Sequence, residues 1–244
     1  MTRAVICGDL HLYDEVTNAA AVRGFLDRIT RNPPNVLILG GDIYELWRRD
    51  LSGAMWMASE FTEAIIDLSE QATDVVYISG NHDDYLRRHT ADADRYPFDP
   101  VLNYRTTIDD LDIFVTHGHK YEPTYNPIAN DVLALTDDHA GRVATWFWSN
   151  RPLPNNPAER VGLFLAGPGG GFFDPESAGT NDLRRRAIKT GIRQETNAGE
   201  WGIYGHTHLP SIDGEDRIAN WGSMTGDRGT YIEVEGSEVR LREV

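Results

Sequence analysis

Five short groups of polar residues along the sequence combine histidine, aspartate and asparagine at close spacing. Imidazole, carboxylate and amide groups are ligands for Mn²⁺, Zn²⁺ and Fe, and no group contains the cysteine of structural zinc sites. A centre for two cations needs about seven such ligands and one bridging carboxylate. The set is sufficient for a dinuclear metal centre, and its members are Asp9-Leu10-His11, Gly40-Gly41-Asp42, Gly80-Asn81-His82-Asp83, His117-Gly118-His119 and Gly205-His206-Thr207-His208.

The spacing of these residues predicts how the ligands divide between two cations. Asp9 and His11 lie two residues apart, so both can reach one ion from a turn that follows a strand. Asp42 is the expected bridge, and His208 completes this first position. We expect two divalent ions, with Mn²⁺ as the first choice and Zn²⁺ or Fe as alternatives. The second position is predicted to use Asn81, His117 and His206.

Each polar group follows a short apolar run that predicts a buried strand. In layered α/β folds, ligands collect beyond the carboxyl ends of strands, so the five groups are expected to converge on one pocket. Any single group could instead be an ordinary turn or a hydrogen-bonded histidine, but five in order favour a site. The predicted strands are residues 4–7, 36–39, 75–78, 113–116 and 202–204.

The helices between these strands are predicted from apolar spacing. Thr17 is the expected cap of a helix whose apolar face carries Val22, Phe25 and Ile29 and which Pro33-Pro34 ends. A second helix is expected over about residues 54–71. After the last histidines, residues 217–219, 231–234 and 239–242 alternate in polarity, which predicts an antiparallel β-meander.

Residues 121–200 interrupt this rhythm and predict a helical insertion within a single domain of residues 1–244. Helices are expected at about 128–148 and 181–195, with a glycine run at 167–171 between them. The expected ligands lie outside the insertion, so it should affect substrate choice more than metal content. Its basic residues could bind a distal phosphate or form a solvated helix face paired with carboxylates, and they are Arg184, Arg185, Arg186, Lys189 and Arg193.

The ordered groups resemble the calcineurin-like metallophosphoesterases, over about residues 1–120 and 200–225. Asn220-Trp221-Gly222-Ser223 is similar to the loop that follows the last histidines of that family. The resemblance implies an α/β fold, a four-layer αββα sandwich of two mixed sheets flanked by helices. It implies hydrolysis of a phosphate mono- or diester, or a pyrophosphate, by a metal-bridging hydroxide. It also implies that His82 faces the phosphate as general acid or electrostatic stabiliser and that Glu45 orients it.

Within that family, the segment Asp42-Ile43-Tyr44-Glu45-Leu46-Trp47 resembles the UDP-2,3-diacylglucosamine hydrolases, which cleave a pyrophosphate in lipid A synthesis. This chain departs from that subgroup at His82, where arginine is usual, and at His119, where aspartate is frequent. The departures leave the chemistry in place and put that substrate in question. Arg87 and Arg88 follow the third group and are candidates for binding the substrate's phosphate.

The composition bears on partners and location. The formal charge of −15 over 244 residues disfavours nucleic acid, and the chemistry of the site leads us to expect a small phosphorylated substrate instead. A nuclease of the same superfamily, which would need a basic groove, is an alternative, as is a catalytically silent binding scaffold. The acid excess, with only two lysines, resembles halophilic cytoplasmic proteins, although a GC-rich genome is an alternative cause.

Three further features predict a cytoplasmic protein. No apolar run is long enough to cross a membrane, and no signal-peptide pattern precedes Asp9. A single cysteine, Cys7, suits a reducing compartment. The sequence leaves the oligomeric state open.

Overall fold

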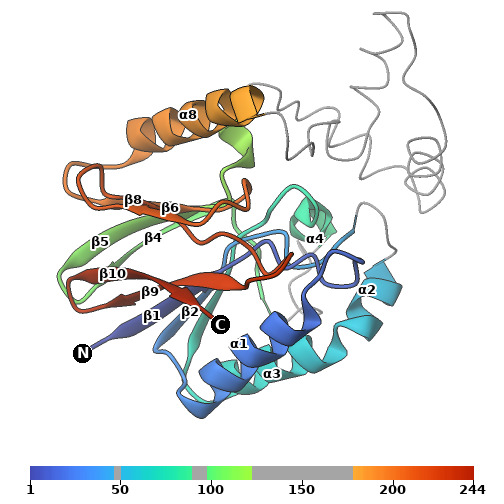
Figure 1. Ribbon diagram of the computed structural model, residues 1–244. Helices are drawn as coiled ribbons and strands as arrows, with labels where there is room; N and C mark the ends of the chain where they lie inside the picture. Colours follow the sequence, from blue (N-terminus) through green and yellow to red (C-terminus); the bar gives the residue numbers. More distant parts are fainter. Residues whose placement is uncertain (47–50, 90–97, 123–177) are drawn as a thin grey trace, which may run out of the picture.

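The computed structural model describes residues 1–46, 51–89, 98–122 and 178–244 (Figure 1). These residues form two five-stranded sheets that pack face to face, with helices on the outer faces. The strand orders are β10-β9-β1-β2-β3 and β4-β5-β6-β8-β7. The predicted αββα sandwich is therefore confirmed. Within the described ranges, no helix is long and apolar enough to cross a membrane.

The first sheet has a parallel centre made of β1 (Arg3–Cys7), β2 (Val36–Leu39) and β3 (Asp74–Tyr77). The antiparallel hairpin β9 (Thr230–Glu235) and β10 (Glu238–Glu243) extends it beside β1. Side chains alternate between its two faces, as the pleat of a strand requires. Val5 and Leu37 face the helices α1 (Ala19–Arg31) and α3 (Ser59–Glu70), whereas Ile6 and Ile38 face the second sheet.

The second sheet combines an antiparallel hairpin with a parallel centre. β4 (Asn103–Ile108) pairs with β5 (Leu111–Thr116), which runs parallel to β6 (Trp201–Tyr204). β8 (Ile218–Asn220) continues the parallel part, and β7 (Ser211–Asp213) closes the edge. Helix α8 (Ala178–Glu195) covers the outer face, where Ile188 and Ile192 pack against Phe114 and Tyr204 (Figure 1).

Helix boundaries differ from the sequence prediction at two places. Asn18, not Thr17, caps α1, because its side-chain oxygen accepts from the Ala21 amide over 3.0 Å. Asparagine is at least as effective as threonine at this position. The helix predicted over residues 54–71 is two helices, α2 (Leu51–Met57) and α3. Helix α3 has a buried apolar face formed by Phe61, Ile65 and Leu68.

The predicted C-terminal meander is wrong in part. β9 and β10 form the expected hairpin, but β8 belongs to the other sheet and runs parallel to β6. β4 and β7 were not predicted, because both are edge strands with polar residues and β7 has only three residues. The short helix α4 (Asp84–His89) follows the third polar group, and η2 (His119–Tyr121) begins at the last residue of the fourth. The helix expected at 128–148 and the glycine run at 167–171 lie outside the described residues.

Candidate metal centre

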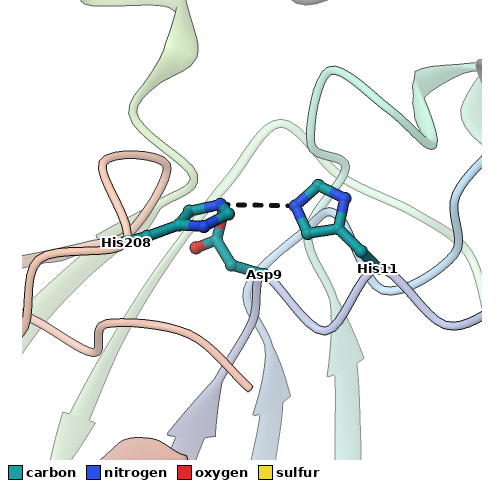
Figure 2. A group of neighbouring side chains, drawn as sticks. All are labelled: Asp9, His11 and His208. Carbon is teal, nitrogen blue, oxygen red and sulfur yellow. Dashed lines mark hydrogen bonds and ion pairs between the residues drawn. The ribbon is translucent and has the colours of Figure 1, made fainter. Parts of the chain in front are cut away.

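The five polar groups come together at one edge of the sandwich. They follow β1, β2 and β3 of the first sheet and β5 and β6 of the second. Because the first three strands are parallel, as are the last two, their carboxyl ends present the groups from both sheets toward one place. Asp9, His11 and His208 illustrate this convergence, since they come from opposite ends of the chain (Figure 2).

The backbone at this place is unusual for residues other than glycine. Five expected ligands have positive φ angles, namely Asp9 at 52°, His11 at 46°, Asp42 at 50°, His206 at 66° and His208 at 55°. Such left-handed conformations are uncommon outside glycine and cluster at functional sites. Backbone hydrogen bonds hold them, including Asp9 N–H to the Gly41 carbonyl over 2.9 Å.

Trp221 forms the floor beneath these turns. Its indole is fully buried and lies so close to Gly8, Gly40 and Gly205 that a Cβ on any of the three would overlap the ring. Glycine is therefore required by close approach at the ends of three strands. From the sequence, Trp221 is recognised only as part of a loop, because nothing in its spacing predicts this contact.

The first candidate cation position lies between Asp9, His11 and His208. Asp9 Oδ1 is 3.2 Å from His208 Nε2, which is 3.3 Å from His11 Nε2 (Figure 2). His11 Nε2 is also 3.9 Å from Asp42 Oδ2. Two ring nitrogens and two carboxylate oxygens thus point toward one small volume, the arrangement expected for this position.

The second candidate position lies on the other side of Asp42. His117 Nε2 is 3.2 Å from Asp42 Oδ2 and 3.4 Å from Asp9 Oδ1. His206 joins Asp42 and His117 in a group whose ligand atoms lie within 4.8 Å of one another. Asp42 therefore belongs to the ligand groups on both sides, the geometry of a bridge.

Three buried atoms of the cluster test whether cations fit. Asp9 Oδ1, Asn81 Oδ1 and His117 Nε2 are inaccessible to solvent and make no hydrogen bond within the described part of the chain. Buried polar atoms are normally satisfied, so each such atom needs an explanation. Across the described ranges, no lysine or arginine forms an ion pair with Asp9 or Asp42, although both carboxylates are buried. Cations at this place would satisfy the atoms and compensate the charge.

A shared carboxylate orients two of the histidines. Glu45, which is buried, lies 3.1 Å from His11 Nδ1 and 2.9 Å from His82 Nδ1. Burial opposes ionisation of Glu45, but contacts with His82 and His11 hold its pKa well below the usual range. The ionised carboxylate accepts the Nδ1 protons, so Nε2 is the ring nitrogen of each histidine that remains for a cation or a substrate. The contact with His82 was expected, whereas the contact with His11 was not.

The other three candidate histidine ligands are also held through the ring nitrogen that points away from the cation. Such outer partners fix the tautomer and orientation of a metal-binding imidazole. None of these contacts was predicted, because Glu122 and Thr225 lie outside any spacing pattern and His119 was identified only as a member of the fourth polar group. The contacts join His117 to His119 at 2.9 Å, His206 to Glu122 at 2.9 Å, and His208 to Thr225 at 3.3 Å.

Asp83 holds the third polar group in place. Its carboxylate accepts hydrogen bonds from the Gly80 amide over 2.7 Å, the Ile43 amide over 2.8 Å and the Tyr77 hydroxyl over 2.6 Å. Burial, with Asp42 nearby, raises the pKa of Asp83 to about 6. The His82 amide in turn donates to Asp42 Oδ1 over 2.7 Å. The loops after β2 and β3 are therefore joined through these two aspartates.

Carboxylate partners are found for Arg87, Arg184 and Arg193 among the basic candidates. Arg87 Nε donates to Asp84 Oδ1 over 2.9 Å, and the side chain of Arg88 lies outside the described residues. In the basic stretch of the insertion, Arg184 pairs with Glu122 and Arg193 pairs with Asp216. These two arginines therefore match the alternative of a helix face paired with carboxylates, rather than that of a free phosphate-binding surface. Phosphate binding by Arg87 and Arg88 stays a prediction.

The comparisons with known proteins identify the class that this fold and site define. The calcineurin-like phosphoesterase family matches residues 2–210, so the chain belongs to that family. It is thus a calcineurin-like metallophosphoesterase, as its motifs predicted. A search of curated proteins gave no match.

Solved structures share the fold at low sequence identity. The phosphoesterase YfcE from E. coli is 14% identical, with a TM-score of 0.50 over 100% of this chain and 98% of that one. A dimetal phosphatase from Danio rerio is 10% identical, with a TM-score of 0.51 over 99% and 95%. A hypothetical protein from Pyrococcus horikoshii OT3 is 13% identical, with a TM-score of 0.51 over 100% and 88%.

Proposed function

We propose that this protein hydrolyses a phosphate mono- or diester, or a pyrophosphate, at a centre of two divalent cations. The observation that carries the proposal is Asp42, which is close to His11 on one side and to His117 and His206 on the other. A carboxylate shared between two ligand groups is what a bridged pair of cations needs. Membership of the phosphoesterase family supports the same reaction.

The proposed ligand set uses the groups on both sides of that bridge. The first position takes Asp9, His11 and His208, and the second takes Asn81, His117 and His206. Bound cations would supply a nucleophile from water at neutral pH and neutralise charge that develops on the phosphoryl oxygens. The chain contributes the orientation of its ring nitrogens and carboxylates, which the outer residues fix before any substrate arrives.

His82 is proposed to act on the substrate. Its Nδ1 is held by Glu45, so the proton that it can give to a leaving oxygen is on Nε2. The potential ligand atoms of His82, His11 and Asp42 also lie within 4.8 Å of one another. The ring centroids of His11 and His82 are 4.7 Å apart. Metal content after substitution of His82 therefore separates a proton donor from an additional ligand.

We propose a small phosphorylated substrate that Arg87 and Arg88 help to bind. The net charge of −15 would repel a polynucleotide over most of the surface. Arg184 and Arg193 are engaged with carboxylates and so do not supply a free basic groove for a nuclease. A binding scaffold would have no need for a complete ligand set. The pyrophosphate bond cleaved by the UDP-2,3-diacylglucosamine hydrolases is one candidate among several.

The cation is proposed to be Mn²⁺, and the protein is proposed to work in the cytoplasm of a halophile. Mixed imidazole, carboxylate and amide ligands suit Mn²⁺, and the acidic composition suits concentrated salt. Unfolding at low and high KCl tests the second proposal. Greater stability in molar KCl is expected, and unchanged stability would contradict it.

The activity itself is tested with purified protein freed of metal by a chelator. Mn²⁺, Zn²⁺ or Fe²⁺ is then added, and hydrolysis is measured for a nitrophenyl monoester, a nitrophenyl diester, a nucleoside diphosphate sugar and single-stranded DNA. We expect metal-dependent hydrolysis of at least one small ester or of the pyrophosphate, with Mn²⁺ the most effective. Activity on DNA alone would favour the nuclease. Absence of all activity together with absence of bound metal would favour the scaffold.

A further inference from the structure

Glu122 connects the second cation position to helix α8. One of its carboxylate oxygens lies 2.9 Å from His206 Nε2, and the other forms an ion pair with Arg184 of α8. The side chains of His206, Glu122 and Arg184 are only 9%, 13% and 17% exposed. The three residues therefore form a largely buried series of contacts from a candidate ligand to the outer helix layer.

The contacts among His206, Glu122 and Arg184 determine which nitrogen of His206 can bind a cation. Glu122 pairs with the guanidinium of Arg184, which carries a positive charge at neutral pH. A carboxylate accepts the Nε2 proton and leaves the Nδ1 lone pair for the cation. Arg184 compensates a charge that would otherwise be buried beside the ring. Removal of Arg184 should therefore weaken the hold of Glu122 on His206.

The segment of residues 119–122 carries outer residues for the second position. His119 holds His117, and Glu122 holds His206. By contrast, the first-position ligands His11 and His208 are held by Glu45 and Thr225, which lie elsewhere in the chain. The two cation positions thus depend on separate outer supports.

Helix α8 clamps this segment against the second sheet. Gly191 of α8 lies against the Tyr121 ring so closely that a Cβ would overlap it. Lys120 Nζ lies 3.0 Å from a carboxylate oxygen of Glu195 at the end of α8. Ile188 and Ile192 anchor the helix in the core beside Tyr121. Segment and helix therefore form one packed unit.

We propose that helix α8, through Arg184 and Glu122, sets the affinity of the second cation position and leaves the first position unaffected. This inference rests on the dinuclear centre proposed above. It differs from the expectation that the insertion acts on substrate choice more than on metal content. Coupling between cation binding and docking of α8 must be reciprocal, so a cation at the second position also stabilises the docked helix.

The test is a Mn²⁺ titration of the full chain followed by electron paramagnetic resonance, which separates single bound ions from magnetically coupled pairs. Arg184→Ala and Glu122→Gln are compared with Arg184→Lys, which keeps the charge, and with Arg185→Ala. Arg185 is the matched control, because it lies on the same helix and its ion-pair partner is Asp182 at 3.7 Å. Circular dichroism verifies that each variant is folded.

We expect the first ion to bind all variants equally and the second to bind Arg184→Ala and Glu122→Gln about 10–100-fold more weakly. Arg184→Lys should recover part of the loss, and Arg185→Ala should match the wild type. Hydrogen exchange supplies a second measurement: Mn²⁺ should slow exchange across residues 182–195 in the wild type and not in Arg184→Ala. Unchanged binding of the second ion, or equal weakening of both ions, would overturn the inference. Failure of the wild type to bind two ions would overturn the dinuclear centre itself.

Discussion

The indole nitrogen of Trp221 donates a hydrogen bond to Asp9 Oδ2 over 2.8 Å. The His206 amide donates to the same oxygen over 2.9 Å. These two donors occupy Oδ2 and turn Oδ1 toward His117 and His208. A residue from the loop after β8 thus determines which oxygen of a β1 ligand faces the candidate cations.

Trp221→Phe should weaken cation binding by about 10–100-fold, because the aromatic volume is largely kept while the donor to Asp9 is lost. The variant should also lose about 1–3 kcal/mol of unfolding free energy, since a buried acceptor loses a partner. Mn²⁺ titration and denaturant unfolding measure the two effects. Trp56→Phe is the control, because Trp56 is 80% exposed. Equal cation affinity in both variants would contradict the role given to the indole.

Asp42→Ala should lose both cations and all metal-dependent activity. The carboxylate lies between His11 and His117, so its removal takes a ligand from each position. It also removes the negative charge that offsets repulsion between the His11 and His117 rings. Metal analysis after gel filtration measures the content. Asp27→Ala, which removes an exposed carboxylate that forms an ion pair with Arg31, serves as the control. Retention of two ions per chain by Asp42→Ala would exclude Asp42 as the bridge.

Cation binding should release protons and become tighter as the pH rises. Burial opposes protonation of His11, but Glu45 and Asp42 raise its pKa to about 9 in the metal-free cluster. Burial likewise opposes protonation of His117, but Asp42 and Asp9 raise its pKa to about 10. Both rings are then protonated at pH 7 and must lose a proton to bind a cation.

The apparent affinity should therefore increase with pH by up to about tenfold per unit for each proton released, until the pH passes these pKa values. Calorimetric titration of Mn²⁺ in two buffers of different ionisation enthalpy counts the protons. An affinity that does not change between pH 6 and pH 8 would show that the rings are already neutral in the metal-free protein.

The sequence identified the residues that cluster at the candidate centre better than it identified the residues that hold them in place. Asp9, Asp42 and His117 could be found because each follows an apolar run, and parallel strands bring such positions together. Glu122 and Thr225 could not be found, because each makes its contact only after distant segments pack. Edge strands β4 and β7 were missed for a related reason, since their polar residues give no apolar pattern.

Glu45→Gln should affect two functions at once. Because Glu45 holds both His11 and His82, the amide should weaken the first cation by about 10–100-fold and also misorient the proton donor. Mn²⁺ titration reports the first effect, and hydrolysis at saturating Mn²⁺ reports the second. Thr225→Val is the matched variant, since Thr225 contacts only His208 among the candidate ligands in the described chain. A normal first cation in Glu45→Gln would limit the role of Glu45 to His82.

His82→Ala should distinguish substrates by their leaving groups. If Nε2 of His82 gives a proton to the departing oxygen, loss of the ring should slow hydrolysis of an alkyl ester, whose alkoxide is strongly basic, by about 10²–10⁴-fold. A nitrophenyl ester needs little protonation, so the same variant should keep much more of its activity on that substrate while retaining both cations. Rates on matched alkyl and nitrophenyl esters, with metal content measured in parallel, provide the comparison. Equal losses on both esters would instead assign His82 to electrostatic stabilisation of the phosphoryl oxygens, and loss of a cation would make His82 a ligand beside His11 and Asp42.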